Sequence, residues 1–129
     1  MLQGRTDQIM TESQGYQLLD TGDEKKLEQI GAHRVVRQAS QAHWPQSKSR
    51  DEWERAAATH VRAQSGGGHW EFQNKLPDNW TLDYGGLSFK VKLTDFGHTG
   101  LFPEQSDQWT WITESSARLE APNVLNLFG

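Results

Sequence analysis

The sequence of 129 residues contains no cysteine. This absence excludes disulfide bonds, thiolate metal sites and cysteine nucleophiles. Long apolar runs are also missing, and none approaches the roughly 20 residues that a membrane-spanning helix needs, so we expect no membrane protein. The N-terminus lacks a basic stretch followed by an apolar one, which predicts no secretory signal and a cytoplasmic location.

The composition is typical of one soluble globular domain. Hydrophobic residues make up 34% of the chain and charged residues 23%, and six Trp and five Phe supply large side chains for a core. The net charge is −4, yet residues 34–62 hold six basic and three acidic side chains. Residues 1–33 and residues 63–129 both hold more acidic than basic side chains. The segment 34–62 either contacts phosphates or forms an ordinary solvated surface.

The basic residues, together with nearby tryptophans, suggest an RNA surface. Aromatic side chains stack on bases, and basic side chains contact phosphates. The residues that would contact RNA are Arg34, Arg37, Arg50, Arg62 and His69, with Trp44, Trp53 or Trp70 as stacking platforms and Lys48 nearby. The alternative is that most of these tryptophans belong to the core. The five histidines show no metal-ligand spacing, so we predict no metal site.

The first half of the chain predicts strands followed by a loop and a short helix. Residues 1–15 resemble a frayed leader, and two antiparallel strands follow at 16–20 and 27–37, joined through Gly22, with Gly31 as a bend or bulge. Residues 38–50 predict a loop. Ser49 and Glu52 match a capping box, which favours a short helix.

The predicted helix has one apolar face, formed by Trp53, Ala57, His60 and Val61. Residues 59–62 equally suit the start of a strand. After them, three glycines at 66–68 indicate a turn before a strand near Trp70. A phosphate-binding loop is the weaker alternative, because the Lys-Ser/Thr that ends a P-loop is missing.

A hairpin is the clearest element of the second half. With Gly85 and Gly86 as its turn, residues 80–84 and 87–93 pair so that the six apolar side chains share one face. The predicted pairs are Tyr84 with Leu87, Leu82 with Phe89, and Trp80 with Val91.

The C-terminal third predicts a glycine-containing loop at 94–105, a helix and a strand. Pro103 suits the first turn of a helix that continues to about Arg118, with Trp109 and Ile112 inward. The apolar run 123–128 lacks alternation and predicts a strand buried on both faces of a parallel sheet. The fold class is therefore α+β, a mainly antiparallel β domain with a Gly-Gly hairpin and two helices.

Four segments of the sequence resemble a known family. They are Tyr16-Gln-Leu-Leu-Asp-Thr-Gly22, Ser65-Gly-Gly-Gly-His-Trp-Glu-Phe72, Phe96-Gly-His-Thr-Gly-Leu-Phe-Pro-Glu-Gln105 and Val124-Leu-Asn-Leu-Phe128. Together they look like the N-terminal part of class I S-adenosylmethionine-dependent methyltransferases related to the 23S ribosomal RNA cytosine methyltransferases. The resemblance covers roughly residues 16–129, and its most specific part is 96–105.

The resemblance implies a division into three parts. Residues 1–15 form a flexible leader, 16–122 a mainly β substrate-recognition domain, and 123–129 the first strand of a truncated Rossmann-like, S-adenosylmethionine-binding domain. The cofactor residues that it implies are Phe102, Glu104, Gln105, Asn126, Phe128 and Gly129. No catalytic residue is implied within this chain, and without cysteine no covalent cysteine adduct can form.

Two functions follow as expectations. The first is the N-terminal region of an S-adenosylmethionine-dependent methyltransferase acting on RNA, which needs a catalytic domain in cis or in trans and by itself binds the cofactor weakly or not at all. The second is a β-rich module that binds RNA or protein without catalysis. An exposed terminal strand also predicts self-association through its edge.

Overall fold

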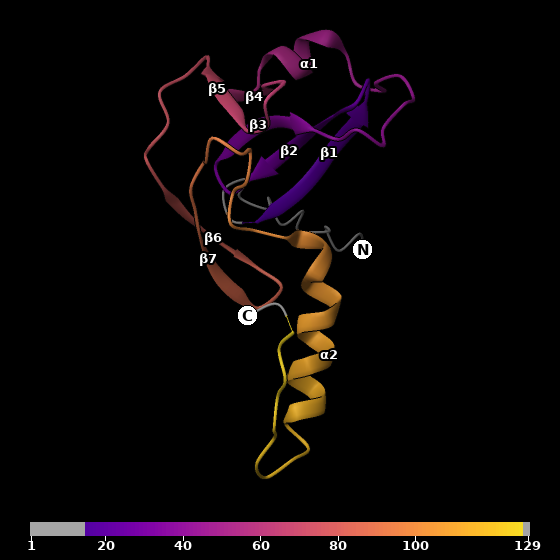
Figure 1. Ribbon diagram of the computed structural model, residues 1–129, viewed down its shortest axis with the longest axis vertical. Coiled ribbons are helices and arrows are strands. Elements are labelled where there is room, and N and C mark those ends of the chain that lie inside the picture. Colours follow the sequence, from indigo (N-terminus) through magenta and orange to yellow (C-terminus); the bar gives the residue numbers. More distant parts are fainter. Residues whose placement is uncertain (1–14, 128–129) are drawn as a thin grey trace, which may run out of the picture.

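The computed structural model describes residues 15–127, and it is an α+β fold with two sheets (Figure 1). The larger sheet has five strands in the order β1-β2-β3-β4-β5, and the smaller is the pair β6-β7. The elements are β1 (Tyr16–Gly22), β2 (Lys25–Ile30), β3 (His33–Gln38), α1 (Arg50–Glu54), β4 (Ala58–Arg62), β5 (Gly68–Phe72), β6 (Trp80–Tyr84), β7 (Leu87–Val91), the 3₁₀ helix η1 (Pro103–Gln105) and α2 (Ser106–Ser116). The predicted leader lies outside the described residues except for Gly15.

The first three strands form an antiparallel meander. The sequence predicted a single strand over 27–37, and this was wrong, because the chain reverses between Ile30 and His33. Gly31 has a φ of +59° at this reversal, a left-handed conformation that glycine adopts without strain. The irregularity in this part of the sheet lies instead in β1, where the register shifts between Leu18 and Asp20.

Helix α1 begins with the predicted capping box. The Ser49 side chain accepts from the Glu52 N–H, and the Glu52 carboxylate accepts from the Ser49 N–H. The helix ends at Glu54, so the predicted helical face extending to Val61 was wrong, and the alternative of a strand at 59–62 is what the chain forms. β4 runs parallel to β3, which gives the mostly antiparallel sheet one parallel pair.

The glycine-rich segment 66–68 connects β4 to β5, which pair antiparallel. β6 and β7 then form a hairpin with Gly85 and Gly86 between them, at φ +57° and +77°. Its register pairs Tyr84 with Leu87, Leu82 with Phe89, and Trp80 with Val91, as the alternation in the sequence predicts.

Helix α2 extends away from the two sheets (Figure 1). Its main contact is Trp109, whose ring centroid lies 5.0 Å from that of Phe89 and 6.4 Å from that of Tyr84. Ile112, predicted to point inward, is 44% exposed. Residues 123–127, predicted as a strand together with Phe128, form no strand within the described chain. Phe128 and Gly129 lie outside the described residues.

Two apolar clusters occupy opposite faces of the larger sheet. One lies between the sheet and the hairpin and includes Ile30, Val35, Ala58, Leu82, Val91 and Leu101. The other lies under α1 and includes Leu27, Val36, Trp53 and Ala56. Between residues 15 and 127, no helix is long and apolar enough to cross a membrane.

Candidate functional site

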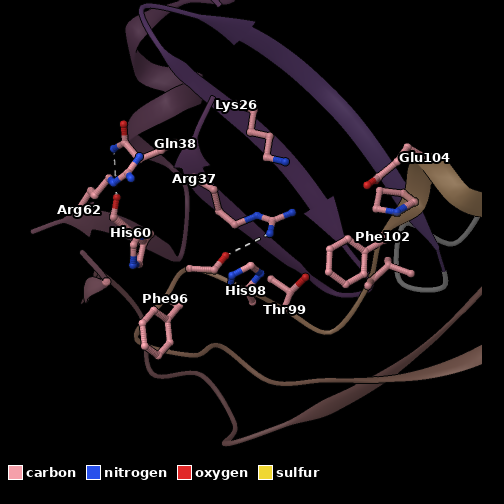
Figure 2. A pocket seen from close by; sticks show the side chains of 14 residues that line it. Lys26, Arg37, Gln38, His60, Arg62, Phe96, His98, Thr99, Phe102 and Glu104 are labelled. Carbon is pink, nitrogen blue, oxygen red and sulfur yellow. Dashed lines mark hydrogen bonds between the residues drawn. The ribbon is translucent and has the colours of Figure 1, made fainter. Parts of the chain in front are cut away.

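A pocket of about 480 Å³ opens where the larger sheet meets the segment 96–104 (Figure 2). Strands β2, β3 and β4 supply its polar wall, and the segment after β7 supplies the opposite wall. The lining residues are Lys26, Arg37, Gln38, His60, Arg62, Gly67, Phe96, Gly97, His98, Thr99, Leu101, Phe102, Pro103 and Glu104. Residues from four distant stretches of the chain therefore meet in one cavity.

A buried ion pair forms the floor of this region. Arg37 donates from Nε to Glu28 Oε2 at 2.6 Å and from Nη2 to Glu28 Oε1 at 2.7 Å. The Tyr16 hydroxyl donates to Glu28 Oε1 at 2.8 Å, and Lys26 Nζ lies 3.5 Å from the same oxygen. The Glu28 side chain has no exposed surface. Two short hydrogen bonds to one carboxylate fix the guanidinium plane.

The pKa values of these groups follow from burial and pairing. Burial alone would raise the pKa of Glu28, but hydrogen bonding and charge from Arg37 hold it below its usual value. Burial alone would lower the pKa of Arg37, and the pairing with Glu28 raises it instead. Burial and the neighbouring Glu28 raise the pKa of Tyr16. Arg37 and Glu28 are therefore both charged at neutral pH, with their charges largely offset.

The third nitrogen of Arg37 reaches across to the opposite wall. Nη1 donates to the Gly97 carbonyl at 3.1 Å, the contact drawn as a dashed line in Figure 2. Trp70 Nε1 donates to the Thr94 carbonyl at 2.7 Å, and His60 Nε2 lies 3.0 Å from the Asp95 carbonyl. Three side chains of the sheet thus hold the backbone of residues 94–97, and this fixes the shape of the pocket.

The pocket brings together four of the residues that the sequence singled out. Arg37 and Arg62, predicted as RNA contacts, lie in the same cavity as Phe102 and Glu104, predicted as cofactor contacts. Gln105 follows directly at the end of η1. The sequence alone did not indicate that the predicted RNA contacts and the predicted cofactor contacts lie in one pocket.

The other predicted residues lie elsewhere. Arg34 donates to Gln29 Oε1, and Arg50 donates to Glu54 on the exposed side of α1. His69 lies beside Glu71 on β5. Asn126 lies in the segment after α2, while Phe128 and Gly129 are outside the described residues.

The predicted stacking tryptophans also have structural partners. The indole of Trp53 is buried and donates to Asp20, and that of Trp44, 52% exposed, donates to Thr21. Trp70 is half-buried against His60, with ring centroids 5.2 Å apart.

Sequence reasoning missed several pocket residues. Lys26 lies in an acidic stretch of sequence, and His60 was assigned to a helix face. Phe96 and Thr99 belong to the motif that carried the family resemblance, but no role was derived for them. Phe96 is 72% exposed although it is a large aromatic residue, whereas Thr99 is 1% exposed. The signal in the sequence that could have indicated Phe96 is a large aromatic residue directly before Gly97, within the predicted loop 94–105.

A second hollow lies on another part of the sheet. Its volume is about 530 Å³, and its basic residues are Arg34, Arg55 and Lys75. It is lined by neither an exposed aromatic ring nor a buried polar side chain without a partner. Within the part of the chain that the structure describes, no group of three His, Asp or Glu side chains could hold a metal ion.

Comparison with known proteins relates the chain to a methyltransferase. It is similar in structure to the S-adenosylmethionine-dependent methyltransferase from Agrobacterium tumefaciens, with a TM-score of 0.77 and 34% sequence identity. The similarity covers 87% of this chain and 36% of that enzyme, so this chain spans little more than a third of the enzyme's length. No protein-family profile and no curated protein matches the chain.

Proposed function

We propose that this chain is the substrate-recognition part of an S-adenosylmethionine-dependent methyltransferase that acts on RNA, and that it contributes one edge of the cofactor pocket. The observation that carries the proposal is the 34% identity to the Agrobacterium tumefaciens methyltransferase over 87% of this chain. A match of that extent includes more than one element of the fold, so a shared short motif does not account for it.

The residues proposed for the cofactor edge suit S-adenosylmethionine chemically. Phe102 is 53% exposed and offers an aromatic face to a sulfonium or an adenine ring. Glu104 supplies a carboxylate that suits an ammonium group, and Gln105 offers an amide that both donates and accepts. S-adenosylmethionine, when bound, supplies an electrophilic methyl group. The residues of this chain bind and orient; none of those described is proposed to exchange a proton with the substrate.

The proposal of RNA as substrate depends on the charge of the pocket. Lys26 and Arg62 line it against one lining carboxylate, Glu104, while the charge of Arg37 is offset by Glu28 and the whole chain is acidic. A local excess of positive charge beside an aromatic residue suits a nucleic acid strand. A pocket shared between the cofactor edge and the basic wall also sets the methyl donor next to the substrate.

A chimera tests the proposal. Residues 16–127 of this chain replace the matching segment of the Agrobacterium tumefaciens enzyme, and calorimetric titration with S-adenosylhomocysteine measures binding. We expect the chimera to bind, and Gln105→Ala to weaken binding about five- to tenfold, the equivalent of one lost hydrogen bond. Gln73→Ala is the control, because this exposed residue follows β5 and does not line the pocket. A folded chimera that binds no cofactor, while the parent enzyme does, contradicts the proposal.

A further inference from the structure

The pocket contains one buried polar atom whose hydrogen bonding is unexplained. Thr99 lines the cavity with 1% of its surface exposed, and its hydroxyl meets no hydrogen-bond partner among residues 15–127. A buried hydroxyl that lacks a partner destabilises the fold, so most such groups have one. A ligand in the pocket is one source of that partner.

The positive charges of the pocket differ in what they already bind. Arg37 is committed to Glu28 and to the Gly97 carbonyl, so it shapes the pocket and has little left to offer a ligand. Arg62, at the end of β4, is exposed and pairs with no carboxylate of the described chain. Lys26 touches Glu28 at 3.5 Å but keeps 29% of its side chain exposed. Arg62 and Lys26 are thus the cations available for a phosphate.

Two exposed aromatic rings flank the same cavity. Phe96 is 72% exposed and Phe102 53% exposed, and both line the pocket (Figure 2). Unlike the other exposed phenylalanine of the described chain, Phe72, these two rings line a cavity, where an exposed aromatic face can stack on a base. The volume of about 480 Å³ falls within the range of about 300–1,000 Å³ that is usual for small-molecule sites.

We propose that this pocket binds one nucleotide of a single-stranded RNA. Arg62 and Lys26 contact its phosphate, Phe96 stacks on its base, and the Thr99 hydroxyl pairs with a polar atom of the nucleotide. Arg37 acts as a positioning residue through Gly97. The proposal rests on the proposed function, because it names the part of the substrate that meets the cofactor edge at Phe102.

The test uses the complete chain labelled with ¹⁵N and titrated with cytidine 5′-monophosphate. We expect saturable shifts in the backbone amides of Gly97, His98 and Thr99, with smaller shifts for cytidine or inorganic phosphate alone. The amides of Ala57 and Asn74, beside the second hollow, serve as the internal reference and should not move.

Matched variants then measure each contact with a fluorescein-labelled RNA of ten nucleotides, by fluorescence anisotropy. Phe96→Ala should weaken binding about tenfold, a typical loss for one stacked base. Arg62→Ala should weaken it and lower the slope of log affinity against log salt by about one. Phe72→Ala, at 57% exposure, and Arg55→Ala, in the second hollow, are the controls and should bind as the unaltered chain does.

Two results overturn the proposal. One is the absence of shifts at residues 97–99 with the nucleotide, and the other is equal loss of affinity in the control variants, which would indicate nonspecific attraction. Cofactor binding by the chimera is measured separately. If the chimera binds the cofactor but the chain binds no nucleotide, the proposed nucleotide site is refuted and the proposed function stands. If the chain binds the nucleotide but the chimera binds no cofactor, the proposed function is refuted.

Discussion

Asp20 is a buried carboxylate that ties β1 to the loop before α1. Its Oδ1 accepts hydrogen bonds from the Thr21 N–H at 2.9 Å and the Ser47 hydroxyl at 2.6 Å. Its Oδ2 accepts from the N–H groups of Ser47 at 3.1 Å and Lys48 at 2.8 Å, and from the Trp53 indole at 3.0 Å. Asp20→Asn keeps the shape of the side chain but turns one acceptor oxygen into a donor, which then faces other donors. We therefore expect the variant to be less stable.

The size of the loss follows from the pKa. Burial alone would raise the pKa of Asp20, but the hydrogen bonds from Ser47, Lys48 and Trp53 lower it to about 2, against an ordinary value of 3.8. That difference corresponds to roughly 2.5 kcal/mol at neutral pH. Because solvent near the surface loop screens part of it, we expect about 1–2 kcal/mol.

The sign of the pH dependence is set by the lowered pKa. Because the carboxylate has a lower pKa in the folded chain than in the unfolded one, its contribution is complete above about pH 4 and is lost as the pH falls from about 4 to 2. Urea unfolding of the unaltered chain and of Asp20→Asn should thus differ at pH 7, and the difference should shrink below pH 4. Asp23→Asn is the control, since this exposed residue has a φ of +49°, which Asn tolerates. A difference that stays constant from pH 7 to pH 2.5 would refute the reasoning.

Three further substitutions test other contacts. Gly97→Ala places a Cβ 2.9 Å from His60 Nδ1 at a φ of +77°, and we expect urea unfolding to show a loss of about 1–2 kcal/mol. Arg37→Met removes the two shortest hydrogen bonds to the buried Glu28 and leaves it only Tyr16 and Lys26, at a cost of about 3–5 kcal/mol, much of which the double variant with Glu28→Leu should recover in the same assay. Trp109→Ala removes the main contact of α2 with the hairpin, so amide hydrogen exchange in α2 should accelerate while exchange in β2 stays unchanged.

Local chemistry explains which elements could be predicted from the sequence. The β6-β7 hairpin follows from two adjacent glycines flanked by alternating apolar residues, because both the turn and the register are encoded within twelve residues. The capping box at Ser49 is likewise local. The local sequence does not decide the structure of residues 27–37, because a single glycine such as Gly31 suits a bulge as well as a chain reversal. The reversal is selected by contacts distant in sequence, namely the pairing of β2 with β1 and the packing of α1 on this part of the sheet.

The candidate site depends on contacts that are distant in sequence. Glu28 and Arg37 are nine residues apart, and only the register of β2 with β3, which sets Glu28 opposite Val35, makes them neighbours. The predicted RNA role of Arg37 therefore did not include its buried partner. Similarly, nothing local to Thr99 indicates that its hydroxyl lies in a cavity with Arg62. The motif at 96–105 was identified from resemblance, whereas its basic wall became visible only in the folded chain.

The most direct measurement of the central claim is methyl transfer itself. The chimera carrying residues 16–127 is incubated with S-adenosylmethionine labelled with tritium in its methyl group and with total RNA, and acid-precipitable label is counted before and after ribonuclease treatment. We expect ribonuclease-sensitive label that falls several-fold in the Arg62→Ala chimera but not in the Arg55→Ala chimera. A chimera that binds cofactor and labels no RNA, or one that labels RNA equally well in both variants, would contradict it.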